Sequence, residues 1–156
     1  MNKPLEPGVK SPAFTLVMDD ETKLSLKDLK GKKVVLYFYP KDDTPGCTKQ
    51  AIAFTGDLAK FKRAGAEVIG VSRDTVQKHQ KFRDKHDLKV RLGSDEDGKV
   101  TEKFGVWVEK SMYGKKFMGI ERTTFLIDET GKIREIWRKV KVPGHAEAVL
   151  DAVKAL

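Results

Sequence analysis

The sequence contains a single cysteine, Cys47, and only three histidines among its 156 residues. One cysteine cannot form a disulfide within the chain, and it excludes a metal site built from several cysteines. His79, His86 and His145 are widely spaced and match no metal or triad pattern, so we expect them on helix surfaces with no role in a site. The sequence therefore predicts no metal and no cofactor.

Long apolar segments are also missing. No run of about eighteen apolar residues, the length that a membrane-spanning helix needs, occurs in the sequence. Residues 1–8 lack the apolar core that is typical of a signal peptide. We therefore expect a cytoplasmic protein with no membrane partner. The length suits one domain, residues 1–156, with a core of its own.

Charged residues are abundant, and their balance is basic. They make up 35% of the chain and give it a net charge of +8 at neutral pH. A basic surface binds nucleic acid when its Lys and Arg residues are clustered. Here they are scattered among acidic residues, with short clusters only around Lys30 to Lys33 and at Lys115 and Lys116. We interpret the charge as a solvated surface and expect no nucleic-acid partner.

The residues before the cysteine predict a strand, a loop and a helix start. Residues 34–39, VVLYFY, form a continuous apolar run that is typical of a strand buried on both faces, and Pro40 ends it. Thr44 and Pro45 are typical of a helix start, with the Thr hydroxyl expected to accept a hydrogen bond from a free backbone N–H. Cys47 then lies in the first turn, where the helix dipole favours its reactive thiolate.

A lone cysteine is often a small, inert core residue. The position of Cys47 at a helix start, directly after a buried strand and its loop, favours a reactive thiol instead. Gly65 is expected to end this helix. One apolar face of the helix carries the sulfur together with Ala51, Phe54, Leu58 and Phe61.

Strands and helices are expected to alternate through the rest of the chain. We predict short strands at residues 12–17 and 24–26, a helical turn at 26–29, a strand at 66–72, a helix from Asp74 or Thr75 to His86, a strand at 88–92 and a short helix at 99–104. A hairpin is predicted from 122–127 and 132–140, followed by a helix at 144–154 that buries Ala148, Val149, Ala152 and Val153. This order is typical of an α/β fold, a thioredoxin-like α/β/α sandwich with a central mixed sheet.

The segment from Tyr37 to Thr48 resembles the active site of the peroxiredoxins, whose pattern is Pro, three residues, Thr or Ser, two residues and Cys. Pro40, Thr44 and Cys47 fit this pattern. Residues 112–128, MYGKKFMGIERTTFLID, resemble the Q-type branch of the family, also called bacterioferritin comigratory proteins. The resemblance covers the chain from about residue 8 to the C-terminus and implies the same thioredoxin-like fold.

The resemblance also implies a function. A peroxiredoxin is a thiol-dependent peroxidase that reduces hydrogen peroxide and organic hydroperoxides to water or alcohols. Cys47 would attack the peroxide and become a sulfenic acid. The resemblance further implies that Thr44 holds the peroxide, Pro40 shields the sulfur and Arg122 reaches it and stabilises the thiolate. Gln50 either faces the same pocket or fills the exposed helix surface.

One departure from the family pattern concerns the recycling of the enzyme. Many Q-type members have a second, resolving cysteine five residues after the first, where this chain has Ile52. We therefore expect a one-cysteine enzyme that is recycled by an external thiol, either a thioredoxin-like protein or a small thiol. The alternative is a peroxide sensor or redox-regulated binding protein that uses the same cysteine. The family suggests a monomer or weak homodimer.

Two aromatic residues outside these motifs, Trp107 and Phe117, form either a pocket wall or, more simply, part of the core.

Overall fold

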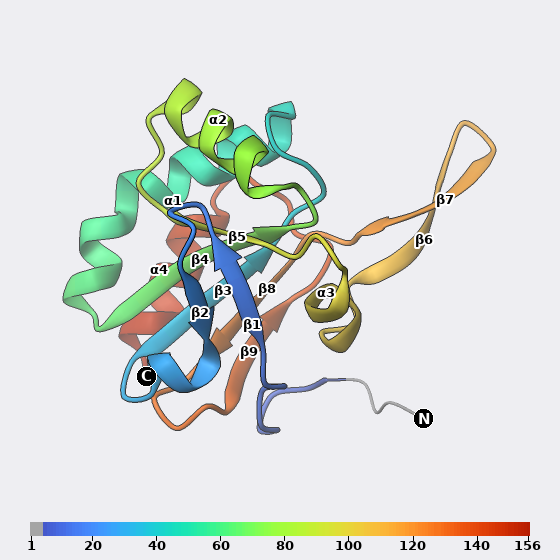
Figure 1. Ribbon diagram of the computed structural model, residues 1–156. Coiled ribbons are helices and arrows are strands. Elements are labelled where there is room, and N and C mark those ends of the chain that lie inside the picture. The colour runs from blue at the N-terminus through green and yellow to red at the C-terminus, as the bar shows by residue number, and fades with distance from the viewer. Residues whose placement is uncertain (1–4) are drawn as a thin grey trace.

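Strands and helices alternate through most of the chain. The computed structural model describes residues 5–156 (Figure 1). The elements, in chain order, are β1 (Thr15–Met18), β2 (Lys23–Ser25), the 3₁₀ helix η1 (Leu26–Leu29), β3 (Lys33–Phe38), α1 (Pro45–Arg63), β4 (Ala66–Ser72), α2 (Val76–His86), β5 (Arg91–Ser94), α3 (Lys99–Lys103), β6 (Trp107–Met112), β7 (Lys115–Ile120), β8 (Thr123–Ile127), β9 (Ile133–Trp137) and α4 (His145–Lys154).

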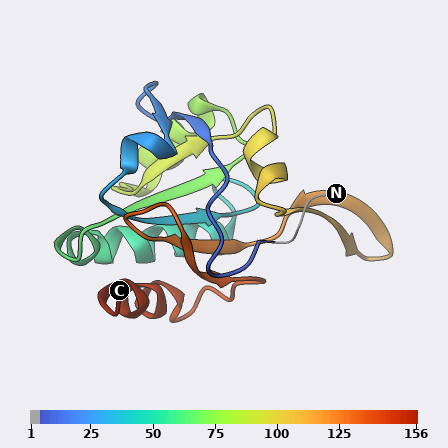
Figure 2. The same cartoon turned by 90° about the horizontal axis from the view of Figure 1, so that it is seen from below.

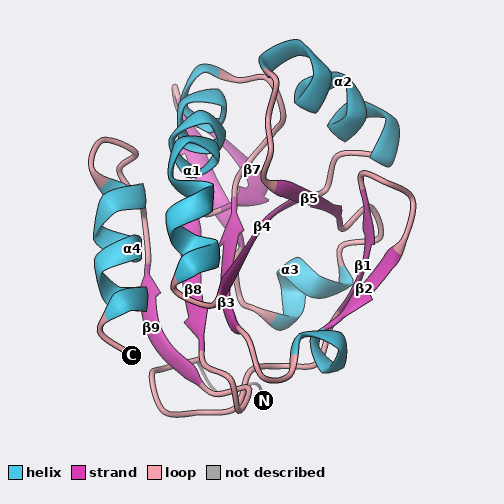
Figure 3. Ribbon diagram, turned by 90° about the vertical axis from the view of Figure 1, so that its left-hand side faces the viewer, coloured by secondary structure: helices cyan, strands magenta, loops and turns pink. Residues whose placement is uncertain are grey.

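Seven of the described strands form one mixed sheet in the order β2-β1-β5-β4-β3-β8-β9. β3, β4 and β5 are parallel, whereas β8 is antiparallel to β3 and β1 is antiparallel to β5. α1 and α4 cover one face of this sheet, and α3 lies on the opposite face (Figures 2 and 3). The predicted α/β/α sandwich with a central mixed sheet is therefore confirmed.

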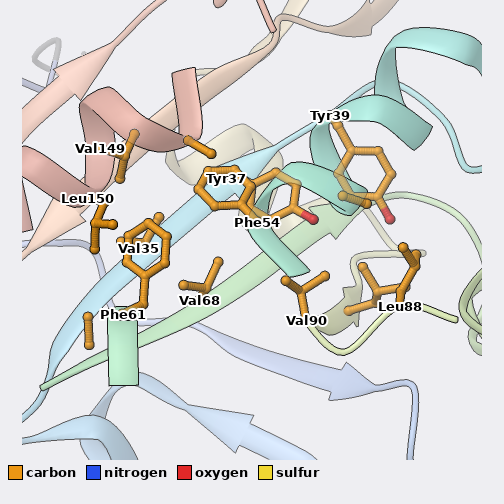
Figure 4. Close-up of a cluster of buried hydrophobic side chains, with 14 of the residues drawn as sticks. Val35, Tyr37, Tyr39, Phe54, Phe61, Val68, Leu88, Val90, Val149 and Leu150 are labelled. Atoms are coloured by element: carbon orange, nitrogen blue, oxygen red, sulfur yellow. The ribbon is translucent and has the colours of Figure 1, made fainter. Parts of the chain in front are cut away.

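β3 lies in the middle of the sandwich, and its sequence explains why. Every side chain from Val34 to Tyr39 is at most 1% exposed. Alternate residues contribute to the cores on the two faces of the sheet, as the continuous apolar run predicts. On the face that α1 covers, the ring of Tyr37 stacks on Phe54 with centroids 4.6 Å apart (Figure 4). This packing fixes α1, and with it the cysteine, against the end of β3.

The predicted helices are present, but one predicted strand and one predicted buried residue differ from the structure. α1 ends at Arg63, just before Gly65, which has a φ of +81°. The predicted strand at 88–92 is displaced, because β5 extends to Ser94 and pairs through Gly93 with Met18 of β1. The prediction that Ala148 is buried is wrong. The buried face of α4 instead consists of His145, Ala146, Val149, Leu150 and Val153.

The β6–β7 hairpin was not predicted. Its strands pair with each other in a separate two-stranded sheet, joined by Tyr113 and Gly114 at φ values of +52° and +78°. Trp107 at its base is half-buried, with the guanidinium carbon of Arg73 3.4 Å above its ring. Phe117 is 45% exposed, so core packing is the wrong interpretation for this residue.

Among residues 5–156, no helix is long and apolar enough to cross a membrane. Over the same residues, no three His, Cys, Asp or Glu side chains are grouped as metal ligands would be.

Candidate active site

The loop between β3 and α1 positions the cysteine. Pro40 is half-buried at the start of this loop, and Thr44 directly precedes the first helical residue, Pro45. Cys47 lies in the first turn and is only 2% exposed, as the helical pattern predicts. The predicted capping is wrong, because the hydroxyl of Thr44 donates to the carbonyl oxygen of Lys41 at 2.9 Å and caps no N–H of the helix.

Arg122 connects the cysteine with Gln50. It lies between β7 and β8, and its Nη2 donates to Sγ of Cys47 at 3.3 Å while Nη1 donates to Oε1 of Gln50 at 2.6 Å. Gly46 permits this approach, since a β-carbon at that position would lie 3.1 Å from Nη2. Gln50 is 2% exposed and therefore faces the site rather than solvent. The structure thus brings together the sulfur and the arginine that the resemblance pairs.

Two buried polar atoms beside this group have no hydrogen-bond partner among the described residues. They are Oη of Tyr37 and Nε2 of Gln50. Burial, followed by the charge of Cys47, raises the pKa of Tyr37 far above its usual value, so the phenol keeps its proton. A buried donor without a protein partner is normally satisfied by water or a ligand. Nε2 of Gln50, whose Oε1 accepts from Arg122, is therefore available to an oxygen atom bound at the site.

Asp42, inside the same loop, is held by three buried groups. The hydroxyl of Tyr39 donates to Oδ1, Nδ1 of His79 lies 2.6 Å from Oδ2, and the backbone N–H of Asp42 donates to Asp74 at 2.8 Å. Nε2 of His79 donates to the carbonyl oxygen of Gly93 at 3.0 Å. The prediction that His79 is a surface residue is therefore wrong, because α2 turns it into the fold.

The prediction of a surface position is also wrong for His145. This residue is 7% exposed, and its Nε2 lies 2.8 Å from Oγ1 of Thr124. Burial and the positive charge of Arg122 lower the pKa of His145 to about 4, so the ring is neutral at neutral pH. His86 is closer to the prediction, since its side chain is 22% exposed and contacts Asp43 through Nε2 at 2.8 Å.

Lys110 is a neighbour of the site that sequence reasoning missed. Its side chain lies across Gly119 of the facing strand, where a β-carbon would be 3.3 Å from Cδ of Lys110. Burial lowers the pKa of Lys110, and the positive charge of Arg122 lowers it further, while Cys47 acts in the opposite direction. Lys110 and Cys47 are far apart along the chain. Only the register of the unpredicted hairpin could therefore have indicated that Lys110 lies near the site.

Comparison with known proteins identifies the class that this fold and site define. Residues 7–136 match the AhpC/TSA family. The chain belongs to this family, and it is a peroxiredoxin, an enzyme of the thioredoxin-like fold.

The relatives define the branch. The chain is 55% identical over 146 residues to the putative peroxiredoxin Bcp of Coxiella burnetii, covering 94% of this chain and 97% of that protein. It is 47% identical to the peroxiredoxin Bcp of Bacillus subtilis, covering 96% of each. A structure of the bacterioferritin comigratory protein of Xanthomonas campestris, from work on its alkyl peroxide reduction, has a TM-score of 0.90 at 44% identity and covers 96% of this chain and 98% of that one. A mutant PrxQ of Xylella fastidiosa has a TM-score of 0.93 at 41% identity, covering 99% and 98%. The resemblance to the Q-type branch is therefore confirmed.

Proposed function

We propose that this chain is a one-cysteine peroxidase that reduces hydrogen peroxide and organic hydroperoxides through a sulfenic acid on Cys47. The observation that carries the proposal is the hydrogen bond of 3.3 Å from Arg122 to the buried sulfur of Cys47. A guanidinium in this position stabilises the thiolate and still has donors for a second anion or oxygen atom.

In the first step the Cys47 thiolate attacks the nearer oxygen of the hydroperoxide. The S–O bond forms as the O–O bond breaks, and the other oxygen leaves as hydroxide or alkoxide, which takes up a proton to give water or an alcohol. The sulfur is left as the sulfenic acid. Arg122 stabilises the charge that develops on the oxygens, which is the transition-state role expected of fixed donors in a buried site.

Thr44, Pro40 and Gln50 complete the proposed site. The hydroxyl of Thr44 donates its hydrogen bond to the backbone carbonyl oxygen of Lys41, so it would hold the peroxide by accepting a hydrogen bond from the peroxide O–H. The side chain of Thr44 does not cap the first turn of α1, which leaves backbone N–H groups there for the peroxide oxygens. The unpaired Nε2 of Gln50 is a further donor, and Pro40 at the start of the loop would shield the sulfur from water.

Recycling needs a thiol from outside the chain. Cys47 is the only cysteine in the sequence, and Ile52 stands, 48% exposed, where many family members have the resolving cysteine. A thiol would attack the sulfenic sulfur and release water, and a second thiol would then reduce the mixed disulfide. We further propose that the chain acts in the cytoplasm as a single domain, residues 1–156, and as a monomer or weak homodimer.

The test is the rate at which hydrogen peroxide oxidises Cys47, measured with a sulfenate trap and intact mass in the wild type and in Arg122→Ala. Oxidation many times faster than that of a free thiolate, and its loss in the variant, would support the proposal. A rate equal to that of a free thiol would reject it. Fast oxidation followed by a partner disulfide, with little turnover by any reductant, would instead support the peroxide sensor.

A further inference from the structure

The β6–β7 hairpin carries much of the exposed apolar surface. Seven large apolar side chains of the described residues are exposed, and four of them lie on this hairpin: Met112, Tyr113, Phe117 and Met118. The hairpin extends away from the sandwich (Figure 1). A concentration of exposed apolar side chains on a projecting element is typical of an interaction surface.

The hairpin leads to the active site through Arg122, and one of its faces carries Lys110. Lys110 is opposite Phe117 and Met112 is opposite Lys115, and opposed residues of an antiparallel pair project to the same side. We call these four residues the hairpin face. The stem of Lys110 crosses Gly119, and the charges of Arg122 and Cys47 both act on its ammonium group. β7 ends at Ile120, two residues before Arg122, and Nη2 of Arg122 donates to Sγ of Cys47 at 3.3 Å. A molecule bound to the hairpin face would therefore lie on the element that leads directly to the cysteine.

The charge of the hairpin face indicates what kind of molecule fits it. The face carries two lysines, whereas the one acidic residue of the hairpin sequence, Glu109, alternates with Lys110 and projects to the other side. There Glu109 is 3.8 Å from Nζ of Lys116. A second copy of this chain, with its net charge of +8, would meet like charge. A partner with acidic and apolar groups is complementary to the face.

We propose that the hairpin face docks a thiol-bearing protein that reduces the Cys47 sulfenic acid, and that this protein has an acidic, apolar surface around its thiol. The inference rests on the proposed function and names the partner class. The partner's thiol sulfur bonds to the Cys47 sulfur as the S–O bond breaks, and the oxygen leaves as water with the thiol proton and one from solvent or the sulfenic acid. A second thiol of the partner then displaces Cys47 as the thiol, so the partner is oxidised to its disulfide.

The test measures the reduction step alone. Cys47 is first oxidised with one equivalent of hydrogen peroxide, and then reduced either by thioredoxin, kept reduced by its reductase and NADPH, or by dithiothreitol. Phe117→Thr is compared with Met118→Thr, because the two side chains are adjacent, 45% and 50% exposed, and on opposite faces. We expect Phe117→Thr to slow reduction by thioredoxin about tenfold, as is usual for removing an aromatic anchor. We expect no change in Met118→Thr, and none with dithiothreitol in either variant.

Charge reversal gives a second matched pair. Lys115→Glu changes the hairpin face, whereas Lys116→Glu changes the opposite face. We expect only Lys115→Glu to slow the reaction with thioredoxin, and the difference from wild type to shrink as salt is added.

Three outcomes would overturn the inference. In the first, thioredoxin reduces the wild type no faster than dithiothreitol does at equal thiol concentration. In the second, thioredoxin reduces Phe117→Thr and the wild type at equal rates. In the third, reduction by thioredoxin is slowed equally in both members of either matched pair of variants. Failure of the proposed function is seen separately, because slow oxidation of wild-type Cys47 by peroxide would be recorded before any reductant is added.

Discussion

Nδ1 of His79 lies 2.6 Å from Oδ2 of Asp42, and both side chains are buried. His79 belongs to α2 and Asp42 to the loop that carries Pro40 and Thr44. The contact therefore ties a helix with no catalytic residue of its own to the loop that sets the position of Cys47. Removing one partner of a buried hydrogen bond usually costs roughly 1–3 kcal/mol, because the other polar group is left without a partner.

Two substitutions of His79 separate its two hydrogen bonds. The amide nitrogen of Asn occupies the place of Nδ1, so His79→Asn keeps the bond to Asp42, whereas that of Gln occupies the place of Nε2, so His79→Gln keeps the bond to Gly93. We expect His79→Gln to slow peroxide oxidation of Cys47 about tenfold, since small displacements of reacting groups are costly. His79→Asn should stay close to wild type. Stopped-flow oxidation of the two variants measures the difference.

Alkylation by iodoacetamide is the control for this pair, because it needs the thiolate but not an aligned peroxide. It should be unchanged in both variants. If both variants lost the peroxide rate in proportion to their loss of thermal stability, His79 would be a structural residue with no specific effect on the loop.

Arg122→Lys tests the geometry of the guanidinium rather than its charge. A lysine keeps the charge but lacks the two-donor fork that now bonds Sγ of Cys47 and Oε1 of Gln50. We expect the rate constant with hydrogen peroxide to fall roughly a hundredfold, the effect of losing a fixed donor to a developing anion. The melting temperature should change little, because Arg122 is only half-buried. A rate near that of the wild type would remove Arg122 from the mechanism.

Gly46→Ala tests the close approach of Arg122 to the start of α1. The new β-carbon would lie 3.1 Å from Nη2, so the guanidinium must move by a few tenths of an ångström. We expect the peroxide rate to fall about tenfold, since a 1 Å misplacement can cost roughly a hundredfold. Stopped-flow oxidation of the variant measures the peroxide rate, and denaturant unfolding measures its stability.

Gly56→Ala is the matched control on the same helix. Among residues 5–156, no atom outside the neighbouring turns of the helix backbone lies within 4 Å of a β-carbon at Gly56. This variant should keep the wild-type rate and gain about 0.5–1 kcal/mol of stability from the better helix former. Equal rates in both alanine variants would show that Gly46 is not needed for the arginine.

The sequence predicted the central strand and the cysteine helix because short sequence patterns mark both elements. A strand buried on both faces is an uninterrupted apolar run, as in residues 34–39, and the helix start is marked by Thr44 and Pro45. The inward position of His79 could not be predicted this way, since it depends on how α2 docks on the loop of Asp42. The hairpin was missed because its turn is Tyr113-Gly114 rather than Asn-Gly and its exposed strands show no apolar alternation.

His145 should make the stability of the fold depend on pH. Its pKa is lowered to about 4 in the folded chain from an unfolded value near 6.5, so the unfolded state binds more protons between these two values. The contribution of His145 to the free energy of unfolding is therefore fully present above about pH 6.5 and is lost as the pH falls toward 4. At pH 5 we expect a loss of about 2 kcal/mol from this group relative to pH 7.

Denaturant unfolding of the wild type and His145→Gln at both pH values measures this contribution. The amide nitrogen of Gln reaches the position of Nε2 and keeps the contact with Thr124, but it does not titrate. The free energy of unfolding should therefore fall less between pH 7 and pH 5 in the variant than in the wild type. An equal fall in both proteins would mean that His145 is protonated in the fold as readily as in the unfolded chain, and that neither its burial nor the positive charge of Arg122 lowers its pKa.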